Sequence, residues 1–262
     1  MGKKKEKDGA QLFDQYYRAV YSERWDSLRQ AMLKESDPVL LSEELTEPYY
    51  MDRASISAAL ALPVKEGDSV LDMCAAPGGK TLSIALRLKG TGSLVSNDRS
   101  PARRQRLKKV IETCLPEEYR NNITVSGHDS TKWGLYEKDR YDCILLDAPC
   151  SSERHVLQDE VELAKWSTNR PKILALTQFA MLAAALDAVK VGGYILYSTC
   201  SINPEEDSRV IEKLFRKRND RFEIVNLCTD SDSSDTEYGN IILPDTSNGC
   251  GPLYFCLIRR TR

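Results

Sequence analysis

Two cysteines stand just after two predicted strands, where a reactive thiol is most useful. Cys150 ends the segment Asp147–Cys150, which follows the apolar run 141–147, and Cys200 follows the apolar run 194–198. The thiolate is the nucleophilic form of cysteine, and a nearby cation such as Lys80 or a helix N-terminus lowers its pKa. One such cysteine is often only a small buried side chain. Two of them beside an acidic residue favour a reactive pair.

A segment of small residues follows the first strand of the predicted sheet and leads into a helix. Its residues are Cys74, Ala75, Ala76, Pro77, Gly78, Gly79 and Lys80. Small side chains let a ligand approach the backbone, and a helix N-terminus favours a negative group such as a carboxylate. The spacing is neither G-x-G-x-x-G nor a P-loop. The alternative is that this segment is only a glycine-rich turn between a strand and a helix and binds no ligand.

Acidic residues also end the next two predicted strands. Asp98 lies 19 positions after Gly79, where a carboxylate accepts hydrogen bonds from the ribose of an adenosine cofactor. A helix cap before Pro101 is the alternative for Asp98. The third strand leads to Asp129 and Ser130, where a carboxylate can hold an adenine amino group. Because no tight pyrophosphate loop is present, S-adenosylmethionine fits this pattern better than a dinucleotide.

The elements that position these residues alternate between strands and helices, which predicts a mainly parallel sheet covered on both faces. Strands are expected at 69–74, 93–97, 123–126, 141–147, 194–198, 222–227 and 253–258, and helices at about 79–89, 101–114, 170–190 and 204–218. We therefore predict a Rossmann-like α/β fold with a seven-stranded, mostly parallel sheet over residues 63–262. Residues 1–62 are expected to form a helical extension that contributes to RNA binding.

From Val70 to Ser201 the chain resembles the Sun-domain family of RNA cytosine-5 methyltransferases. The matching segments are Asp72–Lys80, Asn97–Asp98, Asp147–Cys150 and Ser198–Glu206, together with Tyr50–Ser55 and Gly251–Phe255. The resemblance implies an S-adenosylmethionine-dependent methyltransferase. It also implies that Cys200 is the nucleophile and that Cys150 assists release of the methylated RNA.

The same resemblance implies roles for the residues around the two cysteines. Asp147 is expected to contact N3 and N4 of the target cytosine, and Lys80 to hold Asp147 or the thiolate. The expected cofactor contacts are Cys74, Ala75, Ala76, Pro77, Gly78, Gly79, Lys80, Asp98, Arg103, Asp129, Ser130 and Asp147. No metal is expected.

The segment Ser151–His155 replaces the Ser-Gly-x-Gly found in many family members and resembles the branch that includes mitochondrial ribosomal-RNA methyltransferases. Ribosomal RNA is therefore the favoured substrate and transfer RNA the alternative. A non-catalytic RNA-binding assembly factor with the same fold is the contrasting hypothesis. A nicotinamide-dependent oxidoreductase is disfavoured because G-x-G-x-x-G is missing.

Composition excludes several other classes of protein. The 262 residues carry a net charge of −2, which argues against non-specific coating of nucleic acid. RNA is instead expected to meet a local face that includes Lys3–Lys5, Arg24, Arg53 and Arg154. The helix that begins at Arg103 is a further candidate, although Arg103 itself is expected to contact the cofactor. A structured RNA substrate or a protein partner is expected to supply further affinity, and the chain itself is expected to be a monomer.

Cysteine spacing and hydropathy point to an intracellular setting. The eight cysteines include no C-x-x-C and there are two histidines, which disfavours a structural zinc site. No apolar run approaches the roughly 18 residues of a membrane span, and the charged N-terminus does not resemble a secretory signal. We therefore expect a cytoplasmic protein without membrane contact. The acidic segment 230–238 is predicted to be a flexible surface loop.

Overall fold

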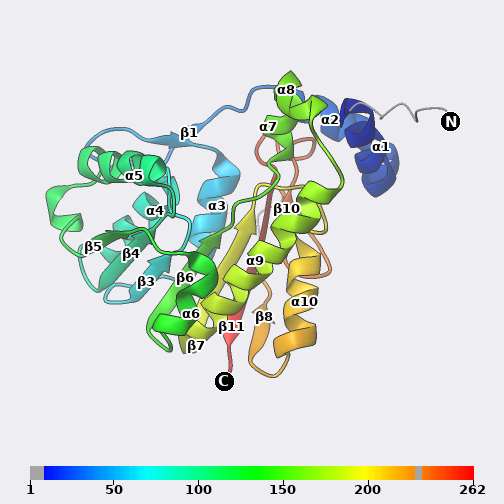
Figure 1. The fold of residues 1–262 in the computed structure, drawn as a ribbon. Coiled ribbons are helices and arrows are strands. Elements are labelled where there is room, and N and C mark those ends of the chain that lie inside the picture. Colours follow the sequence, from blue (N-terminus) through cyan, green and yellow to red (C-terminus); the bar gives the residue numbers. More distant parts are fainter. Residues whose placement is uncertain (1–8, 228–231) are drawn as a thin grey trace.

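The apolar runs after Gly67 form one sheet in the computed structural model, which describes residues 9–227 and 232–262 (Figure 1). Its strands are β3 (Ser69–Asp72), β4 (Ser93–Asn97), β5 (Ile123–Ser126), β6 (Tyr141–Asp147), β7 (Val189–Thr199), β8 (Phe222–Val225), β9 (Ser233–Asp235), β10 (Asn240–Ile242) and β11 (Leu253–Arg260). Two further strands, β1 (Val39–Leu40) and β2 (Tyr50–Met51), form a separate antiparallel pair.

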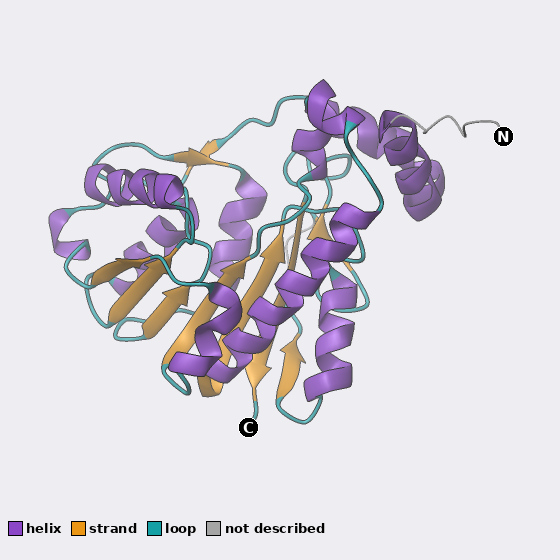
Figure 2. Cartoon of the chain, in the orientation of Figure 1, coloured by secondary structure: helices purple, strands orange, loops and turns teal. Residues whose placement is uncertain are grey.

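Helices lie on both faces of this sheet (Figure 2). They are α1 (Gly9–Tyr21), α2 (Trp25–Leu33), α3 (Arg53–Ala61), α4 (Gly79–Leu88), α5 (Pro101–Cys114), α6 (Trp133–Tyr136), α7 (Glu153–Gln158), α8 (Glu160–Ala164), α9 (Asn169–Ala188) and α10 (Ser208–Arg218). The strand order is β5-β4-β3-β6-β7-β11-β10-β9, and β8 pairs with β11 beside β10.

The sheet has the topology that creates a ligand crevice. Strands β3 to β7 are parallel, and β11 runs antiparallel to β7. The chain moves outward from β3 to β5 and then returns to place β6 on the other side of β3. Ligands bind beyond the carboxyl ends of strands at such a reversal. The segments after β3 and β6 therefore lie at the crevice.

Alternation along the strands divides the core between the two faces of the sheet. Val70 and Leu145 pack with α3, α4 and α5, whereas Leu71, Ile144 and Leu146 pack with α6, α9 and α10. Continuous apolar runs such as 143–146 thus fill both layers. This arrangement confirms the expected mainly parallel α/β sheet.

A third core cluster attaches the N-terminal helices to the rest of the chain. Tyr17 and Trp25 stack with ring centroids 5.4 Å apart, and Trp166 lies 5.8 Å from Tyr17. Val156 and Leu157 of α7 complete the cluster. Because α7 begins three residues after Cys150, this packing supports one of the two cysteine loops.

The structure differs from the sequence-based expectation at the far edge of the sheet. Instead of seven strands, the sheet has nine among the described residues, because β9 and β10 extend it beyond β11. Part of the expected flexible loop 230–238 is strand β9, while 230 and 231 lie outside the described residues. Three-residue strands are too short to produce a hydrophobic period, and backbone pairing with β10 forms them regardless of their polar side chains.

Helix α9 has the length and hydropathy of a membrane span, with a mean hydropathy of 1.2. It packs on β6, β7, α6 and α10. The core helix of a soluble protein can have the same length and hydropathy as a membrane span. The expectation that no apolar run approaches the length of a membrane span is therefore wrong for this helix, of whose apolar window 39% is buried while Ile173 and Leu176 are exposed.

Candidate active site

The two cysteines predicted to carry the chemistry are in contact. Their Sγ atoms lie 3.1 Å apart, and the Ser152 hydroxyl lies 3.3 Å from Cys200 Sγ. Contacts with the Cys150 thiol and with Ser152 lower the pKa of Cys200, whose side chain is exposed. The contact with Cys200 and burial raise the pKa of Cys150 well above its ordinary value. Cys200 is therefore the thiol that ionises first.

The parallel pairing of β6 and β7 brings these residues together. Asp147 at the end of β6 is in register with Ser198 near the end of β7, and the Ser198 hydroxyl donates to Asp147 Oδ1 at 2.8 Å. The chain continues from both strands into adjacent loops. Cys150 and Cys200 consequently meet, although 50 positions separate them in the sequence.

Lys80, in the first turn of α4, fixes the orientation of Asp147. Its Nζ donates to Asp147 Oδ2 at 2.8 Å and lies 3.4 Å from the Ser55 hydroxyl. Burial disfavours the charged ammonium, but the Asp147 carboxylate outweighs that effect and raises the pKa of Lys80. Lys80 therefore remains a cation, and Asp147 is held on both of its oxygens.

A buried carboxyl group lies near this ion pair at the end of β3. Asp72 accepts a hydrogen bond from Thr81 Oγ1 at 2.7 Å, while its Oδ1 has no partner among the described residues. Burial raises the pKa of Asp72 to about 7. The sequence analysis assigned no role to this residue.

A cavity of about 430 Å³ lies at the carboxyl ends of β3, β4 and β5. Its lining residues are Met73, Cys74, Asp98, Arg99, Ser100, Arg103, Asp129, Ser130, Thr131, Pro149, Thr177 and Met181. Five of the predicted cofactor residues are thus brought together: Cys74, Asp98, Arg103, Asp129 and Ser130. Thr177 and Met181, one turn apart on α9, were not identified from the sequence because an apolar helix gives no signal of which residues line a cavity.

Asp98 has the environment expected of a ligand-binding carboxylate. Asp98 is 4% exposed, and within the described part of the chain its Oδ2 has no hydrogen-bond partner, although Arg103 Nε lies 3.5 Å away. The cap of α5 is Ser100, whose hydroxyl accepts from the backbone of Arg103, so Asp98 is not needed as the helix cap. A buried acceptor at the cavity fits a ligand that brings hydroxyl donors.

Asp129 and Ser130 also have structural partners. Asp129 caps a short 3-10 helix (Ser130–Lys132), and hydrogen bonds from Thr131 lower its pKa. The Ser130 hydroxyl donates to the backbone oxygen of Met73 at 2.8 Å. Ser130 thereby ties the segment after β5 to the end of β3, whereas Asp129 fixes the short helix that follows it, and both residues line the cavity.

The small residues after Cys74 serve close packing. Ala75, Ala76, Pro77, Gly78 and Gly79 are absent from the cavity lining, as are Lys80 and Asp147. Gly78 has a φ of +128°, and a Cβ there would lie 2.9 Å from Val110 Cγ1. A Cβ on Gly79 would lie 2.9 Å from Tyr49 Cε1. Arg103 donates to the Ala76 oxygen, which links this loop to the cavity wall.

A larger cleft of about 1000 Å³ opens on Cys200. Asp52, Ser55, Ser152, His155 and Pro252 are among its lining residues. Pro149 lines the smaller cavity and Ser152 the larger one. The Cys150 loop therefore separates the two spaces, as a two-substrate transfer reaction requires.

The basic residues expected to face RNA near this cleft are engaged within the chain. Arg154 donates to the backbone oxygens of Gly249 at 2.8 Å and Lys34 at 2.7 Å. Arg24 pairs with Asp245 at 2.7 Å. Lys3–Lys5 lie outside the described residues.

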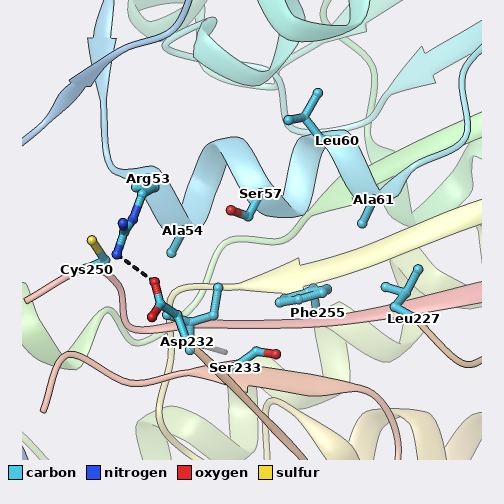
Figure 3. A pocket seen from close by; sticks show the side chains of 11 residues that line it. Arg53, Ala54, Ser57, Leu60, Ala61, Leu227, Asp232, Ser233, Cys250 and Phe255 are labelled. Carbon is cyan, nitrogen blue, oxygen red and sulfur yellow. Dashed lines mark hydrogen bonds and ion pairs between the residues drawn. The ribbon is translucent and has the colours of Figure 1, made fainter. Parts of the chain in front are cut away.

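A further cavity, of about 290 Å³, lies between α3 and strands β10 and β11 (Figure 3). Arg53 spans one end of it and pairs with Asp232 at 2.6 Å (Figure 3). The opposite wall is largely apolar and includes Phe255 and Leu227. Arg53, the last of the expected RNA-contacting arginines, is thus also engaged within the chain.

Comparison with known proteins identifies the family. The family described as 16S rRNA methyltransferase RsmB/F matches residues 59–258. The 5-cytosine rRNA methyltransferase NSUN4 of Mus musculus is 37% identical over 233 residues, which are 82% of this chain and 61% of that protein. The mitochondrial tRNA (cytosine(34)-C(5))-methyltransferase of Danio rerio is 33% identical over 227 residues, again 82% of this chain and 61% of the relative.

A solved structure, NSun6 from Pyrococcus horikoshii with SFG, has a TM-score of 0.68 at 24% identity. The match covers 84% of this chain and 54% of that one. The chain thus spans about three fifths of the length of the curated relatives it matches. The match over residues 59–258 confirms the Sun-domain resemblance, and the chain belongs to the RsmB/F family of RNA methyltransferases.

Proposed function

We propose that this chain methylates carbon 5 of cytosine in RNA, with S-adenosylmethionine as methyl donor. The observation that carries the proposal is the contact between Cys150 and Cys200 beside the Lys80–Asp147 ion pair. Two thiols and one fixed carboxylate at the boundary of two cavities suit a transfer reaction with a covalent step. The relatives named as cytosine-5 methyltransferases of RNA support the same reaction.

Cys200 begins the reaction in this proposal. Carbon 5 of cytosine is a poor nucleophile until a thiolate adds to carbon 6 of the ring. Cys200 suits this step because it has the lower pKa of the two thiols and lines the larger cleft. The target base has to be unpaired or extruded from a helix to reach the thiol.

Asp147 and Cys150 complete the cycle. Asp147 is held by Lys80 and Ser198, so its position is fixed before RNA arrives, and it contacts N3 and N4 of the cytosine ring. After carbon 5 has lost its proton, the bond from carbon 6 to Cys200 breaks by elimination. Cys150, 3.1 Å from the departing sulfur, assists that release.

The cavity near β3, β4 and β5 suits the cofactor. Asp98 offers its unpartnered buried oxygen to the ribose hydroxyls, and Asp129 lies on the side expected to face the adenine. When bound, S-adenosylmethionine supplies an electrophilic methyl group. Pro149 lines this cavity next to Cys150, which brings the cofactor site close to the two thiols.

Ribosomal RNA is the substrate we favour, because the Mus musculus relative is named as an rRNA methyltransferase and is 37% identical. Transfer RNA is the second candidate, because the Danio rerio relative at 33% is named as a tRNA methyltransferase. Separate incubation of the protein with ribosomal and transfer RNA, with methyl-labelled cofactor, tests the choice. We expect labelled 5-methylcytidine in ribosomal RNA. Label in transfer RNA alone would select the second candidate, and no label in either would favour a non-catalytic assembly factor.

A further inference from the structure

Two fully buried glutamates join the loops that carry the cysteines. Glu153 and Glu206 are each 0% exposed. No Lys, Arg or His within residues 9–227 and 232–262 forms an ion pair with either carboxyl group. A buried carboxylate without a cation is costly unless it is protonated or fully hydrogen-bonded. Two of them near the reactive thiols therefore require an explanation.

Each glutamate binds the loop that carries the other cysteine. Glu153, three residues after Cys150, accepts from the backbone N–H of Ile202 at 3.1 Å. Glu206, six residues after Cys200, accepts from the backbone N–H of Ser151 at 2.9 Å. The exchange is reciprocal, so the two loops cannot separate without breaking both contacts.

The two oxygens of each carboxyl group have different neighbours. Glu153 Oε2 faces the Ile202 N–H, whereas Glu153 Oε1 faces the hydroxyls of Tyr17 at 2.6 Å and Ser201 at 3.2 Å. Hydroxyls both donate and accept, so a proton on Oε1 is compatible with every contact.

Glu206 repeats this arrangement. Its Oε2 accepts from the N–H groups of Ser151 at 2.9 Å and Gln178 at 2.8 Å. Its Oε1 faces the hydroxyls of Ser151 and Ser201, the latter at 3.4 Å. The Ser201 hydroxyl thus lies between the two Oε1 atoms, where it can donate to one carboxyl group and accept from the other.

The raised pKa values of Glu153 and Glu206 agree with a proton held between the two carboxyl groups. Burial raises the pKa of Glu153, and burial together with the charge of Glu153 raises the pKa of Glu206 to about 7. The remaining acidic neighbour is Asp207, whose pKa burial also raises. Asp207 accepts from the Thr199 hydroxyl at 2.6 Å, on the side of the strand that carries Cys200.

We propose that Glu153 and Glu206 are positioning residues that share one proton through the Ser201 hydroxyl and hold Cys150 and Cys200 in contact. The need for two adjacent thiols rests on the proposed function, but the carboxyl pair and its effect on thiol spacing do not. Neither glutamate touches a sulfur, so their action on the thiols passes through Ser151 and Ser201.

The experiment measures the spacing of the thiols directly, without RNA or cofactor. Diamide oxidises two adjacent thiols to a disulfide and itself takes up the two electrons and two protons they lose. The rate of the Cys150–Cys200 cross-link is followed by mass spectrometry of peptides. We expect Glu206→Ala and Glu153→Ala to slow it roughly tenfold or more. Asp72→Asn, which alters another buried acid outside both loops, is the matched control and should leave the rate unchanged.

Substitution by glutamine shows whether the hydrogen bonds of Glu153 and Glu206, or only the packing of their side chains, hold the two loops together. A glutamine at either position can accept from the N–H groups and donate to the hydroxyls, as a protonated glutamate does. We therefore expect Glu206→Gln and Glu153→Gln to keep the cross-linking rate within about twofold of the wild-type rate. Wild-type rates in the alanine variants, or glutamine variants as slow as alanine ones, would overturn the proposal. Circular dichroism shows whether each variant is folded. If the alanine variants are unfolded, the cross-linking rates of the glutamine variants test the proposal.

The shared proton has its own readout. When pH rises through about 7, the pKa of Glu206, the wild-type pair loses its proton and the two carboxylates repel, which Glu206→Gln prevents. The ratio of wild-type to Glu206→Gln cross-linking rates should therefore fall roughly threefold or more between about pH 6 and pH 8.5. A constant ratio would refute the shared proton. Because no methylation is measured, failure of the proposed reaction would leave this result intact.

Discussion

Asp98 presents a buried oxygen at the wall of the smaller cavity that accepts no hydrogen bond from the residues the structure describes. Asp98→Ala removes the acceptor proposed for the ribose hydroxyls, so we expect S-adenosylmethionine binding to weaken by about 1–3 kcal/mol. Isothermal titration calorimetry measures this loss. Asp220→Ala removes an exposed carboxylate at a distant turn and serves as the control. Equal affinity in both variants would contradict the assignment.

Glu206 should make stability depend on pH. Its pKa is about 7 in the folded chain against 4.5 in the unfolded chain, so the folded state holds a proton that the unfolded state has lost. Its contribution is present at low pH and is lost as pH rises from about 4.5 to about 7. Relative to Glu206→Gln, wild-type stability should fall by about 3 kcal/mol over that range. Urea unfolding at several pH values measures the free energy of unfolding of both proteins. A difference between wild type and Glu206→Gln that does not change with pH would contradict this expectation.

Residues at strand ends were predictable, whereas residues brought in by packing were not. Cys150, Cys200, Asp147 and Asp98 follow apolar runs, and parallel pairing places such positions together. Glu153 and Glu206 carry no comparable signal, because two glutamates 53 positions apart become neighbours only through the contact of two loops. The packing role of Gly78 likewise depends on Val110 of another helix.

At the scale of elements, long periodic segments were predicted well. Strands β4, β5 and β6 and helix α5 have the expected bounds. Strands β9 and β10 were missed because three residues show no period, and α7 and α8 were missed because they are short and depend on packing against α1 and α2.

The arginines expected to bind RNA near the larger cleft pair with groups of the same chain. Helix α5 therefore becomes the candidate source of cations for RNA. Arg106, Lys108 and Lys109 are exposed, and none forms an ion pair within the described ranges. Changing all three to Gln should weaken RNA binding and flatten its dependence on salt, because fewer phosphates are neutralised. Cofactor affinity should stay unchanged.

Filter binding across a salt series measures this effect. The same change at Arg216, Lys217 and Arg218, a basic cluster at the end of α10, is the control. Equal losses in both variants would indicate a general effect of charge and would count against a specific role for α5.

At the scale of the whole molecule, α1 and α2 are part of the folded core. Trp25 is fully buried, and Tyr17 of the same cluster donates to Glu153 at 2.6 Å. Trp25→Ala should lower the free energy of unfolding by about 3–5 kcal/mol. Denaturant unfolding measures it, with Val20→Ala on the more exposed side of α1 as the control. If Trp25→Ala unfolded in a single transition with the wild-type free energy of unfolding, α1 and α2 would not be coupled to the rest of the fold.

In the proposed reaction, Cys200 attacks the cytosine and Cys150 assists its release. Denaturing electrophoresis after incubation with RNA and S-adenosylmethionine tests it most directly. Cys150→Ala should accumulate a protein–RNA adduct that survives denaturation, because addition and methyl transfer proceed while elimination slows. The Cys150→Ala/Cys200→Ala double variant should form none, and Cys200→Ala alone should form neither adduct nor 5-methylcytidine. An adduct that persists without Cys200, or methylation by Cys200→Ala, would contradict the account.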